Sequence, residues 1–300
     1  MRNLVIIEAP SNLGLKSLQP GTEPGARLFP EALRKTGFAG NTGISHTILV
    51  PAPPYSMDIH AGSKIRNAAA IADYSRTLAT HVQEVIEQGL IPVVIGGDCS
   101  ILLGNTLALK NTGGRYGLFF IDGHTDYMLP EHSGTAGAAG MDLALVTGNG
   151  PAILSDIDKQ GPYIAEEFVF SYGNRELDED YVAIIKDSNI RYYDLPAIRE
   201  QGIDRITADF LRMTEQNHLD GFWVHMDVDV LNNEIMPCVD SPQEDGLSYQ
   251  ELKQTLQPLL ASPSFKGINI TILDPTLDPH GTYTAAFSAQ LSALLKPVNI

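Results

Sequence analysis

Basic residues are scarce in this sequence. The chain has 20 lysines and arginines against 36 aspartates and glutamates, which gives a formal net charge of −16 with neutral histidines. A surface of this sign repels nucleic acids and anionic membranes, so we expect neither as a partner. The acidic surface is compatible with a cationic small molecule, but simple solubility is the favoured explanation.

Cysteines and long apolar runs are scarce as well. Two cysteines, Cys99 and Cys238, do not make a disulfide framework in 300 residues, and this favours a reducing compartment. No apolar run approaches the roughly 20 residues of a membrane span. The first residues also lack the apolar core and cleavage site of a signal peptide. We therefore expect a cytoplasmic protein.

Short apolar runs alternate with longer helical patterns along the chain. Several of the runs are apolar on both faces, as in parallel strands covered by helices. The predicted strands are residues 3–9, 46–52, 91–97, 116–123, 168–173, 190–195, 221–230 and 267–275. The predicted helices include residues 66–89, 178–188, 197–217 and 248–262. This alternation predicts an α/β fold, with a doubly wound, mostly parallel sheet flanked by helices on both faces. With no repeat or linker, we expect one domain over residues 1–300.

Two segments rich in glycine and proline interrupt this alternation. Residues 10–30 and residues 128–152 are predicted to be long loops. Long loops in compact domains are often functional, although surface loops without a function fit the pattern as well.

Polar residues gather where three of the predicted strands end. They are Asp98 with Cys99; Asp122, His124 and Asp126; and His225, Asp227 and Asp229. Alternate residues of an extended strand share a face, so each triplet would point one way if its segment stays extended. In open α/β sheets, ligand sites lie outside the carboxyl ends of the strands. The three sets are therefore candidates for one site.

Carboxylates that converge beside buried strands need cations. An isolated buried carboxylate is costly, and metal ions supply the missing positive charge. Asp98 or Asp126 alone would fit a helix cap or a turn, but two such triplets favour a metal site. Oxygen and imidazole ligands suit Mn²⁺, Fe²⁺ or Zn²⁺, and the excess of acids favours Mn²⁺. Two ions that share carboxylates would lie about 3.5–4 Å apart around a bridging hydroxide.

These motifs resemble those of the arginase/ureohydrolase family, with this chain as a divergent member. The family signatures G-G-D-H-[SG], D-A-H-x-D and [ST]-x-D-x-D-x-x-D-P stand here as GGDCS (96–100), DGHTD (122–126) and HMDVDVLNNEIMP (225–237). The resemblance spans the whole chain. It implies an arginase-like three-layer α/β/α fold, and hydrolysis of a guanidino or amidino C–N bond by metal-bound hydroxide. It also implies a homo-oligomer, since the family often forms trimers or hexamers.

The resemblance further implies two Mn²⁺ ions per chain and assigns their ligands. Asp122 and Asp227 would bridge the ions, and His124 and Asp229 would complete one of them. Asp126 would bind the other ion and hydrogen-bond the hydroxide, which makes it a catalytic candidate. Cys99 stands where the family has a histidine ligand. A thiolate there would make Zn²⁺ or Fe²⁺ possible, since both are softer than Mn²⁺.

Several positions depart from the family pattern. The guanidinium-binding glutamate falls on Ile272 and the proton-shuttling histidine falls on Ala139. Thr135 keeps a hydroxyl where arginases have serine. Asp178 stands near the position that meets the substrate amino group, and His132 is a further candidate for substrate contact. These changes argue against a plain arginase and leave the metal ligands largely in place.

Two residues keep more than one interpretation. Cys99 is predicted to be a metal ligand; it could also be a packed thiol, or a nucleophile if a base lowered its pKa. His225, which replaces the family's serine or threonine, is a candidate for catalysis as a proton shuttle. It could equally be an additional ligand, a hydrogen-bonding partner of a ligand, or an ordinary core histidine. Cys238 is predicted to be a packing residue.

The sequence thus predicts a metal-dependent hydrolase that cleaves a C–N bond in a small amidino-type or related substrate. A neutral or hydroxylated guanidine, or a formimino group, would suit the loss of the glutamate at Ile272. The alternative is a non-catalytic metal-binding or ligand-sensing protein on the same scaffold. The retained Asp126 argues against this alternative.

Overall fold

Eight strands form one sheet in the computed structural model, which describes residues 3–19, 21–176 and 178–296. The strands are β1 (Leu4–Ala9), β2 (Thr47–Leu49), β3 (Ile91–Gly96), β4 (Tyr116–Ile121), β5 (Val169–Asn174), β6 (Arg191–Asp194), β7 (Gly221–Asp227) and β8 (Phe265–Thr271). Their order is β2-β1-β3-β8-β7-β4-β5-β6, and every neighbouring pair is parallel. The eight predicted strands and the doubly wound parallel sheet are confirmed.

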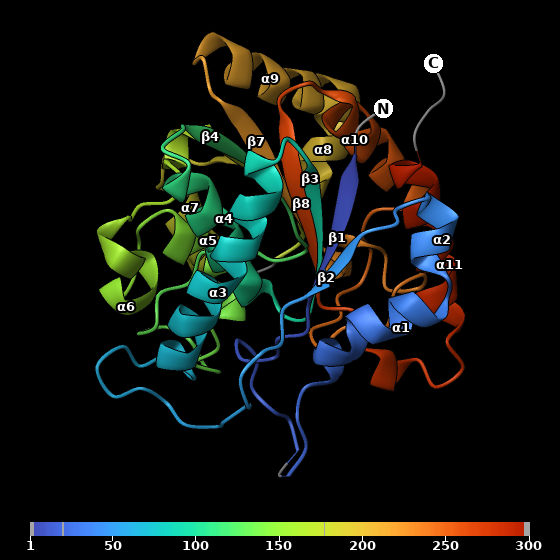
Figure 1. Cartoon of the computed structure of the whole chain (residues 1–300). Coiled ribbons are helices and arrows are strands. Elements are labelled where there is room, and N and C mark those ends of the chain that lie inside the picture. Colours follow the sequence, from blue (N-terminus) through green and yellow to red (C-terminus); the bar gives the residue numbers. More distant parts are fainter. Residues whose placement is uncertain (1–2, 20, 177, 297–300) are drawn as a thin grey trace.

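Helices cover both faces of this sheet, as Figure 1 shows. One face carries α3 (Ala68–Glu87), α4 (Leu102–Asn111), α5 (Asp142–Val146), α6 (Ala152–Ser155) and α7 (Glu179–Lys186). The other carries α1 (Phe29–Lys35), α2 (Phe38–Thr42), α8 (Leu195–Gln201), α9 (Ile203–Gln216), α10 (Tyr249–Ala261) and α11 (Thr282–Leu295). Short 3₁₀ helices lie at Gly25–Leu28, Cys99–Ile101, Ala139–Met141, Ile157–Lys159, Glu166–Phe168, Val228–Val230 and Pro275–Leu277. The fold is therefore a three-layer α/β/α arrangement.

The central strands are largely apolar on both faces because both faces are covered. Every residue of β4 is buried. Phe119 packs into the core on the α9 side, whereas Phe120 packs into the core on the α3 side. A strand buried on two faces has no reason to alternate polar and apolar residues. Such strands leave polar side chains to gather at their ends.

The predicted helices are confirmed, with one interruption. The pattern at 197–217 forms two helices, since Gly202 between them takes a φ of 90°, outside the helical range. Helix α10 begins after a capping box formed by Ser248 and Glu251, as the S-x-x-E pattern suggests.

The two segments predicted to be loops are partly helical. The first contains the 3₁₀ helix Gly25–Leu28, and its residue Pro20 lies outside the described residues. The second contains α5, whose residues pack into the core on the α3 side of the sheet. In the described ranges, no helix combines the length and apolarity needed to cross a membrane.

The turn after β3 depends on a glycine that is in close contact with the backbone after β1. A Cβ atom added at Gly97 would lie 1.6 Å from the carbonyl oxygen of Ser11, and backbone atoms cannot move aside as a side chain can.

We expect Gly97→Ala to destabilise the protein by about 2–3 kcal/mol in urea unfolding, as overpacked sites do. Gly40→Ala is the control, because nothing lies within 4 Å of its Cβ position. Equal stability of the two variants would contradict the prediction.

Candidate metal centre

Acidic and sulfur ligands converge where β3, β4 and β7 end. Asp122 follows β4 directly, Asp227 ends β7, and Cys99 begins the 3₁₀ helix after β3. Three groups of side chains could each hold a metal ion, because within each group the potential ligand atoms lie within 4.8 Å of one another. They are Cys99, Asp122 and Asp227; Asp122, His124 and Asp229; and Cys99, Asp142 and His225. The first two groups share Asp122, as two neighbouring metal ions would require.

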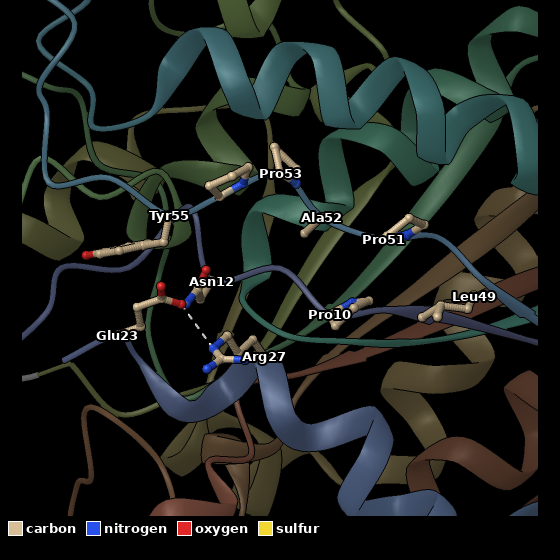
Figure 2. Close-up of a pocket in the computed structure, with 10 residues that line it drawn as sticks. Pro10, Asn12, Glu23, Arg27, Leu49, Pro51, Ala52, Pro53 and Tyr55 are labelled. Atoms are coloured by element: carbon tan, nitrogen blue, oxygen red, sulfur yellow. Dashed lines mark hydrogen bonds and ion pairs between the residues drawn. The ribbon is translucent and has the colours of Figure 1, made fainter.

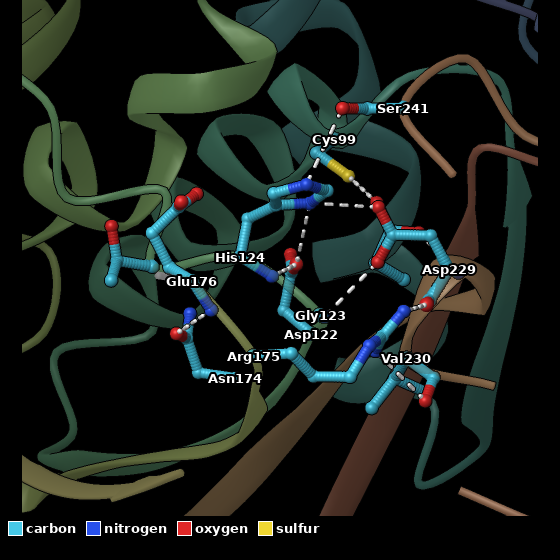
Figure 3. Close-up of polar contacts among 12 residues, drawn as sticks. Cys99, Asp122, Gly123, His124, Asn174, Arg175, Glu176, Asp229, Val230 and Ser241 are labelled. Atoms are coloured by element: carbon cyan, nitrogen blue, oxygen red, sulfur yellow. Dashed lines mark hydrogen bonds and ion pairs between the residues drawn. The ribbon is translucent and has the colours of Figure 1, made fainter. Parts of the chain in front are cut away.

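The group around His124 is tied together by hydrogen bonds, shown in Figure 3. The Nδ1 atom of His124 lies 2.9 Å from Oδ2 of Asp229. The backbone N–H of His124 donates to Oδ1 of Asp122 at 2.6 Å, and Gly123 N–H donates to Oδ1 of Asp229 at 3.0 Å. Arg175 donates to the backbone oxygen of Asp229 at 2.8 Å. These bonds fix the directions of the two carboxylates without a metal.

Cys99 lies against a carboxylate and a hydroxyl group. Its Sγ donates to Oδ2 of Asp227 at 2.8 Å and lies 3.1 Å from Oγ1 of Thr271. Complete burial, and then the charge of Asp227, raise the pKa of the Cys99 thiol well above its usual value. A thiol that keeps its proton is a poor nucleophile, so this geometry disfavours the nucleophile hypothesis. A bound cation would displace the proton.

The two triplets do not stay extended, so the condition for each to point one way is not met. Strand β4 ends at Ile121, and Asp126 has a φ of 45°. Strand β7 ends at Asp227, and Asp229 lies in the 3₁₀ helix Val228–Val230. Tight turns after the strands, rather than strand alternation, bring these side chains together.

The cluster binds protons tightly when no cation is present. Burial is the first cause that raises the pKa values of Asp122, Asp126 and Asp227 well above the usual range, and neighbouring carboxylates add to it. Burial also opposes the charge of His124, but the carboxylates of Asp229 and Asp122 outweigh it and raise its pKa to about 9. Asp122 Oδ2 is buried without a hydrogen-bond partner among the described residues. The donor set and this unpartnered oxygen fit a divalent cation.

Asp126 and the predicted substrate contacts lie outside the three ligand groups. Asp126 is buried and interacts with Asp122. Thr135 and His132 are exposed on the loop after β4. Asp178 is exposed and caps α7 by accepting from the backbone of the first helical turn. The catalytic and substrate-binding roles of these residues stay predictions.

Ile272 and Ala139 lie in the interior, where the family pattern has a glutamate and a histidine. Ile272 is 3% exposed, and its φ of 78° is strained for a β-branched residue. Its N–H donates to the carbonyl of Gly97 at 2.7 Å, which ties this strained residue to the turn after β3. Ala139 is buried at the start of a 3₁₀ helix.

Asp142 belongs to the cluster, and the sequence reasoning missed it. It begins α5, is completely buried, and has no hydrogen-bond partner in the described structure for either carboxylate oxygen. Burial, and then Asp122, raise its pKa well above the usual range. The available signal was an acid directly before the apolar run LALV, but that pattern is also typical of a helix start.

A surface pocket lies beside the first loop, apart from the predicted ligands (Figure 2). Its lining includes Asn12, Glu23, Arg27, Pro53 and Tyr55 and none of the predicted metal ligands. Asn12 donates to Glu23, and Glu23 pairs with Arg27 at 3.0 Å. These polar groups satisfy one another, so the pocket adds no ligand to the cluster.

The fold and the cluster together define a class of protein. It is a three-layer α/β/α protein with groups of side chains able to bind a metal at the carboxyl edge of a parallel sheet. A sequence model of the arginase family matches residues 2–295. The chain therefore belongs to the arginase family, and this confirms the family resemblance and indicates a metal-dependent hydrolase of amidino C–N bonds.

Known proteins similar to this chain include arginases. It is 28% identical over 297 residues to an arginase of Staphylococcus aureus, covering 97% of this chain and 95% of the relative. The solved arginase of Bacillus caldovelox is 25% identical, covers 100% of both chains and has a TM-score of 0.88. A formimidoylglutamase from Bacillus subtilis, 20% identical with a TM-score of 0.68, covers 99% of this chain and 89% of its own. That last likeness supports the fold alone.

The proton binding of the cluster predicts how the stability of the protein changes with pH once a chelator has removed its metal ions. The folded state raises the pKa of His124 from 6.5 to about 9. The resulting stabilisation is complete below pH 6.5 and is lost as the pH rises towards 9. The raised pKa values of Asp122, Asp126 and Asp227 likewise make the folded state less stable as the pH rises. We expect the melting temperature of chelated protein to fall by several degrees between pH 6.5 and 9.

The control for this measurement is the metal-loaded protein. There the cation replaces the protons, so its melting temperature should change less over the same interval. A chelated protein whose melting temperature stays constant, or rises, from pH 6.5 to 9 would show that the cluster does not hold these protons.

Proposed function

We propose that this chain is a hydrolase with two divalent metal ions that cleaves a C–N bond in a small amidino-type substrate and is not a plain arginase. The observation that carries the proposal is the pair of ligand groups that share Asp122. One shared carboxylate between two ligand sets is the arrangement that paired metal ions need. Family membership supports the same chemistry.

The ligands divide between two sites in this proposal. Cys99, Asp122 and Asp227 would hold one ion together with Asp126. Asp122, His124 and Asp229 would hold the other, and Asp227 would be shared between the two ions. When bound, paired divalent ions supply a water nucleophile at neutral pH by lowering its pKa. Mn²⁺ suits the carboxylates, and the sulfur of Cys99 makes Zn²⁺ or Fe²⁺ a competitor.

The chain's own residues orient the reactants and carry the protons. Asp126, buried beside Asp122, would accept a proton from the attacking water and pass it to the departing amine. The hydrogen bonds from Gly123 and Arg175 to Asp229 keep that ligand in one orientation. A buried site of this kind also excludes bulk water from the reacting carbon.

The side chain at position 272 shapes the proposal for the substrate. Ile272 offers no carboxylate, so a fully charged guanidinium would have no anionic partner at this position. A neutral or hydroxylated guanidine, or a formimino group, fits an apolar neighbour better. A protein named as a formimidoylglutamase shares this fold, which supports including formimino compounds among the candidate substrates.

Metal content and turnover test the proposal together. We expect about two ions per purified chain after loading with Mn²⁺, and release of urea, formamide or ammonia from at least one member of an amidine panel. Metal binding without turnover across arginine, agmatine, hydroxylated guanidines and formimino compounds would favour the alternative of a non-catalytic sensor. Fast turnover of arginine would refute the proposal that the protein is not a plain arginase.

Asp126→Asn tests the proton-handling role. The amide keeps the size of the side chain but cannot accept a proton, so the rate should fall at least about 100-fold. Folding should be retained, as judged by the same cooperative thermal transition. An Asp126→Asn protein with the full rate would refute the proposed mechanism.

Cys99 variants test the sulfur ligand. Cys99→Ala should lower the metal content by about one ion per chain, whereas Cys99→His should restore it with a stronger preference for Mn²⁺. Cys99→Ser is the control of matched size, with a weaker ligand. An unchanged metal content in Cys99→Ala would make Cys99 a packing residue.

A further inference from the structure

His225 lies in the middle of the sheet, out of reach of solvent. On β7 it is in register with Phe120 of β4 on one side and Asn269 of β8 on the other. The Phe120 ring stacks on the imidazole, with the ring centroids 4.5 Å apart and an interplanar angle of 10°. All three side chains have an exposed fraction of 0%. The imidazole is thus held between two strands, away from water.

Trp223 determines which way the amide of Asn269 faces. An indole N–H can only donate, and it lies 2.7 Å from Oδ1 of Asn269. The amide nitrogen of Asn269 must then face Nδ1 of His225, at 2.7 Å. Gly267 makes room for the indole, since a Cβ there would lie 2.2 Å from Trp223 Cζ3.

This chain of hydrogen bonds fixes the tautomer of His225. An amide nitrogen only donates, so Nδ1 of His225 accepts and carries no proton. In a neutral imidazole the proton therefore sits on Nε2. The Nε2 atom lies 3.9 Å from Oδ2 of Asp122 and 4.0 Å from Oδ2 of Asp142. Among the described residues, Nε2 and both of these oxygens lack a hydrogen-bond partner. The donor and the two acceptors therefore match, at a distance that a small shift or one water would close.

The same geometry argues against His225 as a metal ligand. Its ligand atom lies within 4.8 Å of those of Cys99 and Asp142, a spacing that suits an ion. A histidine that binds a metal needs a free electron pair on the binding nitrogen and donates its other N–H to an acceptor. In His225 the arrangement is reversed: Nδ1, remote from the cluster, accepts a hydrogen bond, so Nε2, which faces the cluster, carries the proton. Proximity alone would therefore assign His225 the wrong role.

We propose that His225 is a positioning residue whose Nε2–H donates to Asp122 and Asp142. It orients the carboxylate that both ligand groups share, and it is not a ligand itself. This inference rests on the proposed function, in which Asp122 binds both ions. Trp223 and Asn269 act through His225 by keeping its proton on Nε2.

The tautomer can be measured directly in the full-length chain. We would label histidine with ¹⁵N and record long-range ¹H–¹⁵N correlations of the chelated and the Zn²⁺-loaded protein. Comparison with His225→Gln and with Asn269→Asp assigns the signals of His225 among the 8 histidines. The expected result is a protonated Nε2 and a bare Nδ1 in both samples. A protonated Nδ1 with Zn²⁺ on Nε2 would overturn the proposal.

The substitution Asn269→Asp should reverse the tautomer of His225. A carboxylate at this position accepts from Trp223 and also from Nδ1–H of His225, so the proton should move from Nε2 to Nδ1. We expect kcat to fall about 10–100-fold with little change in KM, as for other residues that orient metal ligands. An unchanged tautomer of His225 in Asn269→Asp would contradict the proposal that Trp223 and Asn269 set this tautomer.

Substitutions of His225 separate positioning from ligation. At saturating Zn²⁺, His225→Leu should keep the metal content of the wild type but lose about 10–100-fold in kcat. His225→Gln, which retains an N–H donor, should recover most of that rate. His46→Gln, at an exposed histidine, is the control. Loss of one ion per chain in His225→Leu would identify His225 as a ligand. If the wild type bound neither Zn²⁺ nor Mn²⁺, the proposed function would fail, whereas the tautomer would still be measurable in the chelated protein.

Discussion

The mutual repulsion of buried carboxylates is the constraint on which the rest of this structure depends. Asp122 lies among Asp126, Asp142, Asp227 and Asp229, and burial and proximity both work against its ionisation. A protein retains such an arrangement at a cost in stability only where a cation or protons compensate the charge. The hydrogen bonds that hold the cluster come from backbone N–H groups, His124 and the Cys99 thiol, and they orient the carboxylates before any ion binds.

The sheet makes this concentration of charge possible. Parallel strands that are apolar on both faces bring their carboxyl ends to one edge, so residues distant in sequence meet there. Asp122 follows β4, Asp227 ends the neighbouring strand β7, and Cys99 follows β3 on the other side of β8. The close packing of Gly97 against Ser11 and the strained backbone of Ile272 belong to the turns that border this edge. Packing energy from the two covered faces is what keeps these costly turns in place.

Much of the fold was predictable from the sequence, because the apolar strands and capped helices are local patterns. Most members of the candidate ligand groups were predictable, but their geometry was not. Asp126 and Asp229 come into place through tight turns, which depend on backbone angles that strand alternation does not describe. Asp142 was not predictable, since an acid at the start of a helix usually serves as a cap. Only the three-dimensional structure shows that both of its oxygens are buried without a partner in the described residues.

Cys99 illustrates how a motif and its surroundings give different information. The motif places a ligand at this position, and the structure adds that the thiol donates to Asp227 when no metal is bound. The same proton therefore has two roles: it compensates the charge of the carboxylate without a metal, and it must leave before sulfur can bind one. Since burial raises the pKa of the thiol, an ion that binds thiolate more strongly displaces this proton more readily near neutral pH. The choice of metal thus depends on this thiol proton as well as on the number of carboxylates around it.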